Sequence, residues 1–451
     1  MIKTIKKLAL LLVLLICMSK THAQSEKSIE QLQKEADAGN KEALYDLAYR
    51  YIDGRGVVKD LTKGFNLMTN AVKKNSIEAQ NTLGWLYENG YGTTKDSKKA
   101  FYWYQKAADN GFPAGQSNLG NCYQVGRGVE IDYEKAFYWY QKAADNNRME
   151  AQANLGKCYE YGNGAKKDED KAFYWYKKAA DGNYAYGQFR LGLCFENGIG
   201  VESDDKMAVY WYLQAANKNL TIAMLNVGIC NQYGKGVPVD YTKALYWYQK
   251  AADDNDANAQ LRLAEMYEEG KGTAIDVHKA FYWYQKAAEG NDPMAQNAFA
   301  NCYENAIGTS YDVNKSFYWF QKAADNNNKT AQRNLGRCYR YSRGVDGDLE
   351  KAFYWYNKGL ENNDVYNQST YEISIYLAEC CEKGIGTKMD LQKAVERYYD
   401  IGIKYEKYDF KMKANQKIIE MIKNGRIDMN HFETIASYDY LVLLLAAVEA
   451  K

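Results

Sequence analysis

Three features of this chain have residue types and spacings that could carry chemistry: a serine and lysine pair, glycine and aspartate loops, and a set of cysteines. Ser203 and Lys206 match the Ser-x-x-Lys pattern, in which a lysine activates a serine nucleophile. The segment falls in a predicted loop, and the companion motifs of such a site are missing. Chance explains the match better, so we expect no catalytic residue and no enzyme activity.

Loops containing glycine and aspartate recur ten times and could be taken for phosphate or metal sites. Glycine occupies the position of Gly92 in every copy, and aspartate occupies the position of Asp96. Glycine accepts positive φ where a first helix ends, and an aspartate before a second helix can cap its first amides. Because all copies share both residues, we interpret them as structural.

Seven cysteines lie at one position of the repeat, which Leu86 and Met266 fill in other copies. Repeats stack about 10 Å apart, whereas a disulfide needs Cα atoms within about 7 Å. We interpret the set as small buried hydrophobic residues, and the adjacent Cys381 forms the only local pair to consider. The seven are Cys122, Cys158, Cys194, Cys230, Cys302, Cys338 and Cys380.

No spacing of histidine and cysteine suits zinc. His278 follows the capping Asp276 at a variable position, so we expect it on the surface. Carboxylates are frequent, but no pair stands out for acid and base chemistry. The sequence therefore predicts neither a metal site nor a cofactor.

Two helices in each repeat must position these residues. The block Phe101 to Asp109 returns verbatim at 137–145 and with small changes every 36 residues. Each unit has an apolar face that it cannot bury alone, so the pattern predicts an all-α solenoid of about ten helix-turn-helix repeats. In one repeat the apolar positions form two helical stripes, namely Ala79, Leu83, Leu86 and Tyr87, then Ala100, Trp103, Tyr104, Ala107 and Ala108.

One repeat shows a family resemblance clearly, in the segments 154–164 (Asn-Leu-Gly-Lys-Cys-Tyr-Glu-Tyr-Gly-Asn-Gly) and 171–183 (Lys-Ala-Phe-Tyr-Trp-Tyr-Lys-Lys-Ala-Ala-Asp-Gly-Asn), with Asp168 between them. These residues resemble the Sel1-like repeat, a relative of the tetratricopeptide repeat. The resemblance implies a right-handed α superhelix that serves as an adaptor or scaffold. Local departures are Ala306 and Ser342, which replace the first loop glycine.

The chain divides into four predicted segments: a signal peptide at 1–23, a half-repeat cap at 24–40, ten repeats at 41–406 with an insertion at 365–370, and C-terminal capping helices at 407–451. Lysines precede a short apolar run that ends near Ala23, the order of a cleavable signal peptide. A lipoprotein site at Cys17 is less favoured because Ile16 precedes it. We expect export to the periplasm or secretion.

The net charge gives little reason to expect nucleic acid. The formal charge is +1, and loss of four lysines with the signal peptide takes it to −3. Neither a basic excess for nucleic acid nor a polybasic segment for anionic membranes is present. We expect a monomer that binds a protein or peptide and does not insert into a membrane after cleavage.

The positions that vary among repeats predict the display surface. Those of Asn81, Trp85 and Asn89 lie on one helical face, and the family resemblance places first helices on the concave side. An open alternative is that these residues pack against neighbouring first helices. Along the stripe the middle is apolar and the end is basic, and the predicted partner-binding residues are Phe189, Leu193, Leu225, Ile229, Tyr233, Leu261, Arg333 and Arg337.

Two rival functions use the same scaffold. Glycans could bind a row of second-helix tyrosines, although we favour packing of these rings at the seams between repeats. A β-lactam-binding or hydrolytic enzyme is the other rival. The β-lactam-binding branch of the family pairs two cysteines in each unit, and this chain has one. The tyrosine row comprises Tyr102, Tyr138, Tyr174, Tyr210, Tyr246, Tyr282, Tyr318 and Tyr354.

Overall fold

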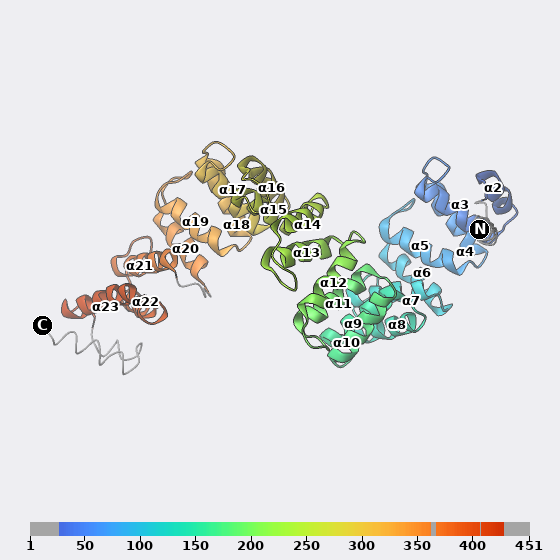
Figure 1. The fold of residues 1–451 in the computed structure, drawn as a ribbon, viewed down its shortest axis with the longest axis horizontal. Helices are drawn as coiled ribbons and strands as arrows, with labels where there is room; N and C mark the ends of the chain where they lie inside the picture. Colours follow the sequence, from blue (N-terminus) through green and yellow to red (C-terminus); the bar gives the residue numbers. More distant parts are fainter. Residues whose placement is uncertain (1–26, 362–366, 406, 428–451) are drawn as a thin grey trace, which may run out of the picture. The chain divides into compact units, whose positions relative to one another are not determined.

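The structure is a computed structural model that describes residues 27–361, 367–405 and 407–427. Across these residues the chain forms 22 helices and no strand (Figure 1). They belong to two compact units, which divide between Leu220 and Thr221. The predicted all-α solenoid of helical repeats is confirmed.

The first unit begins with one unpaired helix, α2 (Ile29–Asp37), followed by five helical pairs. Each helix contacts the helix that follows it. The pairs are α3 (Lys41–Asp53) with α4 (Leu61–Lys73), α5 (Ile77–Asn89) with α6 (Ser97–Asp109), α7 (Pro113–Val125) with α8 (Tyr133–Asp145), α9 (Met149–Tyr161) with α10 (Glu169–Asp181), and α11 (Ala185–Asn197) with α12 (Asp205–Ala216).

The second unit repeats the arrangement with five pairs and a last described helix. That helix, α23 (Tyr408–Lys423), lies in the segment 407–451, where C-terminal capping helices were predicted. The pairs are α13 (Thr221–Tyr233) with α14 (Tyr241–Asp253), α15 (Ala257–Glu269) with α16 (Val277–Glu289), α17 (Pro293–Asn305) with α18 (Val313–Asp325), α19 (Lys329–Arg340) with α20 (Leu349–Leu360), and α21 (Gln368–Lys383) with α22 (Leu391–Lys404).

The ends of the repeat array are covered by single helices. Helix α2 buries Leu32 and Ala36 in one core with α3 and α4. Helix α23 buries Phe410 and Ile418 against α21 and α22. The insertion at 365–370 is in part helical, because α21 starts at Gln368. The rest of the predicted C-terminal capping segment, from residue 428 on, and the predicted signal peptide lie outside the described residues.

The repeated aspartate caps the second helix, as predicted. The Oδ1 atom of Asp168 accepts a hydrogen bond of 3.0 Å from the Lys171 amide, and Asp96 accepts one of 2.9 Å from Lys99. These amide bonds favour the charged carboxylate, so they hold the pKa of both aspartates below the ordinary value. This local role accounts for the aspartate in each loop.

The glycine at the position of Gly92 has a second role that the sequence did not reveal. It has a φ of 69°, but it lies two residues beyond Gly90, the C-cap of α5. A Cβ atom at Gly92 would collide with the carbonyl of Leu61, the first residue of α4 in the preceding repeat. The glycine therefore allows the loop of one repeat to lie directly on the backbone of the repeat before it.

All eight cysteines in the described residues are free and buried, including Cys381. Removal from water disfavours a thiolate, which raises the pKa of the Cys122 thiol to about 12 and that of Cys158 to about 11. The adjacent Cys380 and Cys381 are not bonded to each other. The interpretation of these residues as part of the packing is confirmed.

We expect the thiols to be protected by the fold and not by disulfides. The native protein, never exposed to a reductant, should react slowly with an aromatic disulfide reagent, because the thiols are buried and protonated. In denaturant the same sample should titrate at least six free thiols, and a reduced sample serves as the control. A titre of two or fewer would show that the chain is stapled by disulfides.

Candidate functional site

Most second helices contribute a buried tyrosine that packs against the first helix of the same repeat. Tyr176 of α10 is fully buried, and its ring lies against Gly156 of α9, where an added Cβ would be 2.7 Å from the ring. The preceding residue of the predicted stripe, Trp175, is also buried, with 9% of its surface exposed. Glycine on the first helix thus makes room for an aromatic ring on the second.

The hydroxyl groups of several of these buried tyrosines donate hydrogen bonds to glutamate side chains, which the sequence analysis did not single out. Tyr176 donates a hydrogen bond of 2.6 Å to Glu160, sixteen residues earlier. Arg190 of the next repeat forms an ion pair with the same carboxylate, and both side chains are about one-tenth exposed. Equivalent tyrosine bonds join Tyr104 to Glu88, Tyr212 to Glu196, Tyr284 to Glu268 and Tyr398 to Glu382.

Variation among repeats is the sequence signal that could have revealed this network. Where the second helix has Met68, the matching first-helix residue is the apolar Ile52. Where it has Phe320, which cannot donate a hydrogen bond, Glu304 pairs instead with Arg337 and Arg343. The glutamates therefore serve the packing between helices and between repeats.

Neighbouring first helices contact one another through the start of the variable stripe. Asn118 of α7 donates a hydrogen bond of 2.9 Å to Asn81 of α5, and Asn334 of α19 donates one of 3.0 Å to Asn297 of α17. This position thus serves packing between repeats, as the alternative interpretation proposed. The last position of the stripe is exposed in Val125, Tyr161, Tyr233 and Tyr341, by 54–57%.

Two of the predicted binding residues are core residues, and their predicted exposure is wrong. Phe189 is only 4% exposed, and its ring centre lies 5.8 Å from that of Tyr212 in the same helical pair. Leu261 is 5% exposed and belongs to the core around Tyr284. Phe189 and Leu261 both occupy the first position of the variable stripe. Successive positions of the stripe are rotated around the helix, and the first of them faces the second helix.

The other apolar candidates reach the surface to different degrees. Leu193 of α11 in the first unit is half-buried. In the second unit, Leu225 and Ile229 of α13 are half-buried, and Tyr233 is 54% exposed. Helix α13 contains no charged residue. It therefore presents a neutral, largely apolar side, although a role in partner binding stays a prediction.

The two arginine candidates lie on α19 and already have partners within the chain. Arg333 donates to the carbonyl of Gly359 at 3.0 Å and to the hydroxyl of Thr330 at 3.1 Å. Arg337 pairs with Glu304 of α17, and about 38% of its side chain is exposed. The structure thus keeps both guanidinium groups in fixed positions, where part of Arg337 remains open to solvent.

The tyrosine row on the second helices is half-exposed throughout. Its members are between 49% and 55% exposed, and each rests edge-on against the tryptophan that follows, as Tyr174 does on Trp175 at 5.1 Å. Lysines one turn later cover several of these rings, and Lys142 lies 5.2 Å from the centre of Tyr138. These contacts agree with the packing interpretation of the row.

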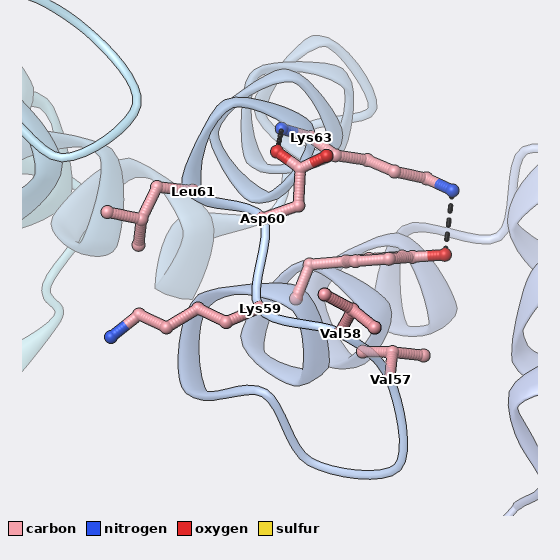
Figure 2. Close-up of a pocket in the computed structure, with 7 residues that line it drawn as sticks. Val57, Val58, Lys59, Asp60, Leu61 and Lys63 are labelled. Atoms are coloured by element: carbon pink, nitrogen blue, oxygen red, sulfur yellow. Dashed lines mark hydrogen bonds between the residues drawn. The ribbon is translucent and has the colours of Figure 1, made fainter.

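A shallow depression of about 820 Å³ lies beside the loop between α3 and α4 (Figure 2). Three of its polar side chains already have partners, because Lys63 donates to the Tyr51 hydroxyl at 2.7 Å and Asp60 caps the Lys63 amide at 2.8 Å. Val58 beside it is 88% exposed. Nothing in this lining converges on a ligand.

Metal binding and membrane insertion are two further roles to consider for the part of the chain that the structure describes. Within 27–361, 367–405 and 407–427, no cluster of three or more His, Cys, Asp or Glu side chains could hold a metal ion. His278 Nδ1 lies 3.2 Å from the carbonyl of Gly308 in a neighbouring loop. Over the same part of the chain, no helix has the length and apolarity needed to cross a membrane.

The Sel1 repeat model matches ten consecutive segments that cover most of the chain, at 41–76, 77–112, 113–147, 150–184, 185–220, 221–256, 257–292, 293–328, 329–364 and 375–396. The chain belongs to the Sel1 repeat family. Sel1 repeat proteins are helical scaffolds that typically take part in protein interactions. The tenth match begins after the insertion, within α21.

Two solved structures of this family are similar over most of their length. A protective antigen of uropathogenic Escherichia coli strains, which displays an SLR fold, has 27% identity and a TM-score of 0.53, and the match covers 94% of this chain and 95% of that one. A Sel1 repeat protein from Oxalobacter formigenes has 29% identity and a TM-score of 0.50, with 72% and 92% covered. No curated protein matches the chain significantly.

Proposed function

We propose that the chain is an exported Sel1 repeat scaffold that binds a protein or peptide on the surface of its first helices and catalyses no reaction. The observation that carries this proposal is α13, an uncharged first helix on which Leu225 and Ile229 are half-buried and Tyr233 is exposed. Apolar side chains gathered on a soluble surface usually mark a contact site. Tyrosine is enriched among the residues that anchor a partner, and isoleucine adds apolar area that binding can remove from water.

The fold supports a display role for this surface. The second helices and the buried tyrosines fix each first helix, while the residues at its outward positions differ from repeat to repeat. Binding specificity can therefore change without loss of the scaffold. Fixed side chains also lose little conformational entropy when a partner binds.

We expect site-specific photo-cross-linking to find the partner on α13. A photoreactive amino acid replaces Ile229 or Tyr233 in the chain produced in its own cells. A matched variant carries it at Tyr246 of α14, which is 52% exposed in the same unit. The first two variants should yield a defined protein adduct, and the third should not. An adduct at Tyr246 alone would place binding on the tyrosine row and remove the first-helix surface from consideration.

Export is the second part of the proposal. A lysine-rich start followed by a short apolar run and Ala23 favours a cleaved signal peptide. The similar protein of uropathogenic E. coli is described as a protective antigen, which fits a protein that leaves the cytoplasm. We expect the mature chain to begin at Gln24 and to be recovered in the periplasm or medium. Recovery of the uncleaved chain in the cytoplasm would contradict this.

A further inference from the structure

Helix α19 differs in charge from the first helices around it. It contains four basic residues and no acidic one. By contrast, α13 is uncharged and α17 contains only Glu304. Helix α15 carries three glutamates and one arginine. The positive charge of the second unit's first helices is thus concentrated in one repeat.

Two of these arginines stand where other repeats have glutamate. Arg337 matches Glu265 and Glu379, and Arg340 matches Glu268 and Glu382. In these two repeats the glutamate at the second position accepts a hydrogen bond from a buried tyrosine, at 2.6 Å from Tyr284 and 3.0 Å from Tyr398. The scaffold common to the repeats therefore does not require an arginine at the position of Arg340. This arginine is specific to the repeat that contains α19.

Only one carboxylate pairs with this group of cations in the described part of the chain. Glu304, whose side chain is 9% exposed, accepts from Arg337 and also from Arg343 at 2.9 Å. Arg333 and Lys329 donate instead to neutral groups, the carbonyls of Gly359 and Lys358, at 3.0 and 2.9 Å. Most of the positive charge is left without a counter-charge in contact.

The geometry also holds these cations in place. The guanidinium of Arg340 lies 3.7 Å from the centre of the Tyr376 ring and 5.0 Å from that of Tyr341. Side chains fixed in this way lose little entropy when an anion binds. Arginine forks match the geometry of carboxylates and can bind them through paired hydrogen bonds. The side chains of Arg337 and Arg343 are 38% and 47% exposed.

We propose that an arginine surface, defined by Lys329, Arg333, Arg337, Arg340 and Arg343, binds a segment of a partner protein that carries clustered carboxylates. This inference rests on the proposed function and names the chemistry of the partner. Beside the arginine surface the stripe is uncharged, with Asn297, Asn301 and Asn305 on α17. Asn301 and Asn305 can hydrogen-bond to the backbone of such a segment, whereas Asn297 is already bonded to Asn334.

A nucleic acid fits the same surface less well. It carries a phosphate at every nucleotide, so it needs positive charge along its whole path. On α15, two repeats away, the stripe instead presents Glu265 and the exposed Glu269. Their charge would repel a long polyanion, whereas a short acidic segment of a protein would end before reaching them. The positive charge is localised to match a local cluster of carboxylates.

The test measures binding of labelled oligoglutamate to the full mature chain by fluorescence anisotropy at low salt. The test variant is Arg333→Gln with Arg343→Gln, which leaves the Arg337 pair with Glu304 intact. Its control, Lys250→Gln with Lys286→Gln on the second helices, removes the same charge from the same unit. Melting curves verify that both variants are folded. Oligoglutamine and oligothymidylate are the comparison probes.

We expect oligoglutamate to bind the unmodified chain and its affinity to fall about tenfold in the arginine variant, with little change in the lysine control. Equal losses in both variants, an absence of binding, or tighter binding of oligothymidylate would overturn the acidic partner. Cross-linking at Tyr233 is independent of this assay. A protein adduct there together with a negative peptide result would leave the proposed function standing and refute this inference alone.

Discussion

Replacing Trp175 by alanine should lower the local free energy of unfolding by about 3–5 kcal/mol, because it removes a large aromatic side chain from a packed core. Trp175 is 9% exposed and lies in one cluster with Leu155, Cys158 and Tyr140. The measurement is hydrogen exchange of the α9 and α10 amides. Local exchange is preferable to a global melt because long repeat arrays do not always unfold in a single step.

The matched control is Tyr174→Ala, one residue away on the same helix. Tyr174 is 55% exposed and contacts Trp175 edge-on, with ring centres 5.1 Å apart. Its loss should cost about 1 kcal/mol, the range typical of one aromatic pair and some surface burial. Similar losses of stability in the two variants would mean that α10 does not bury the face that carries Trp175.

Replacing Gly164 by alanine should lower the free energy of unfolding by about 2–5 kcal/mol, which combines left-handed strain with overpacking. Gly164 has a φ of 74°, and an added Cβ would collide with the carbonyl of Tyr133, the first residue of α8. A backbone carbonyl cannot turn away as a flexible side chain can. Relief requires the loop to move off α8, which would weaken the contact between the two repeats.

Gly162→Ala separates these two contributions. Gly162 has a similar φ of 73°, but the nearest atom to an added Cβ lies 3.6 Å away. Ala306 occupies the same position in another repeat with a φ of 56°. We expect a cost of about 1–2 kcal/mol, the strain alone, measured by exchange of the α8 and α10 amides. Equal costs at Gly162 and Gly164 would show that the backbone contact does not constrain the loop.

The second-helix aspartates, the first-helix stripes and the buried thiols could be predicted from sequence because each depends on local spacing. An aspartate three residues before a helical amide caps that amide wherever the pair occurs, as Asp168 does for Lys171. The cysteine position follows the apolar stripe of its own helix. Ten copies of the pattern made these local inferences consistent with one another.

The tertiary structure decided which faces of those helices meet. Phe189 and Leu193 lie one turn apart on the predicted surface stripe, yet Phe189 is buried against Tyr212 and Leu193 is only half-buried. The spacing of a single helix defines a stripe, but the width that its partners cover depends on how closely they approach. That approach is set by glycines such as Gly156, which admit a tyrosine ring between helices.

Contacts between repeats were also beyond the sequence pattern. The network of Tyr176, Glu160 and Arg190 joins residues that are 16 and 30 positions apart, so no helical period relates all three. The same holds for the arginine surface, where Arg333 and Arg337 were visible as variable residues but their partners, the Gly359 carbonyl and Glu304, were not. Sequence alone determined the repeat, its helices and their caps, because those depend on neighbours along the chain. The burial and charge balance of each candidate residue were decided by packing between helices, because they depend on neighbours in space.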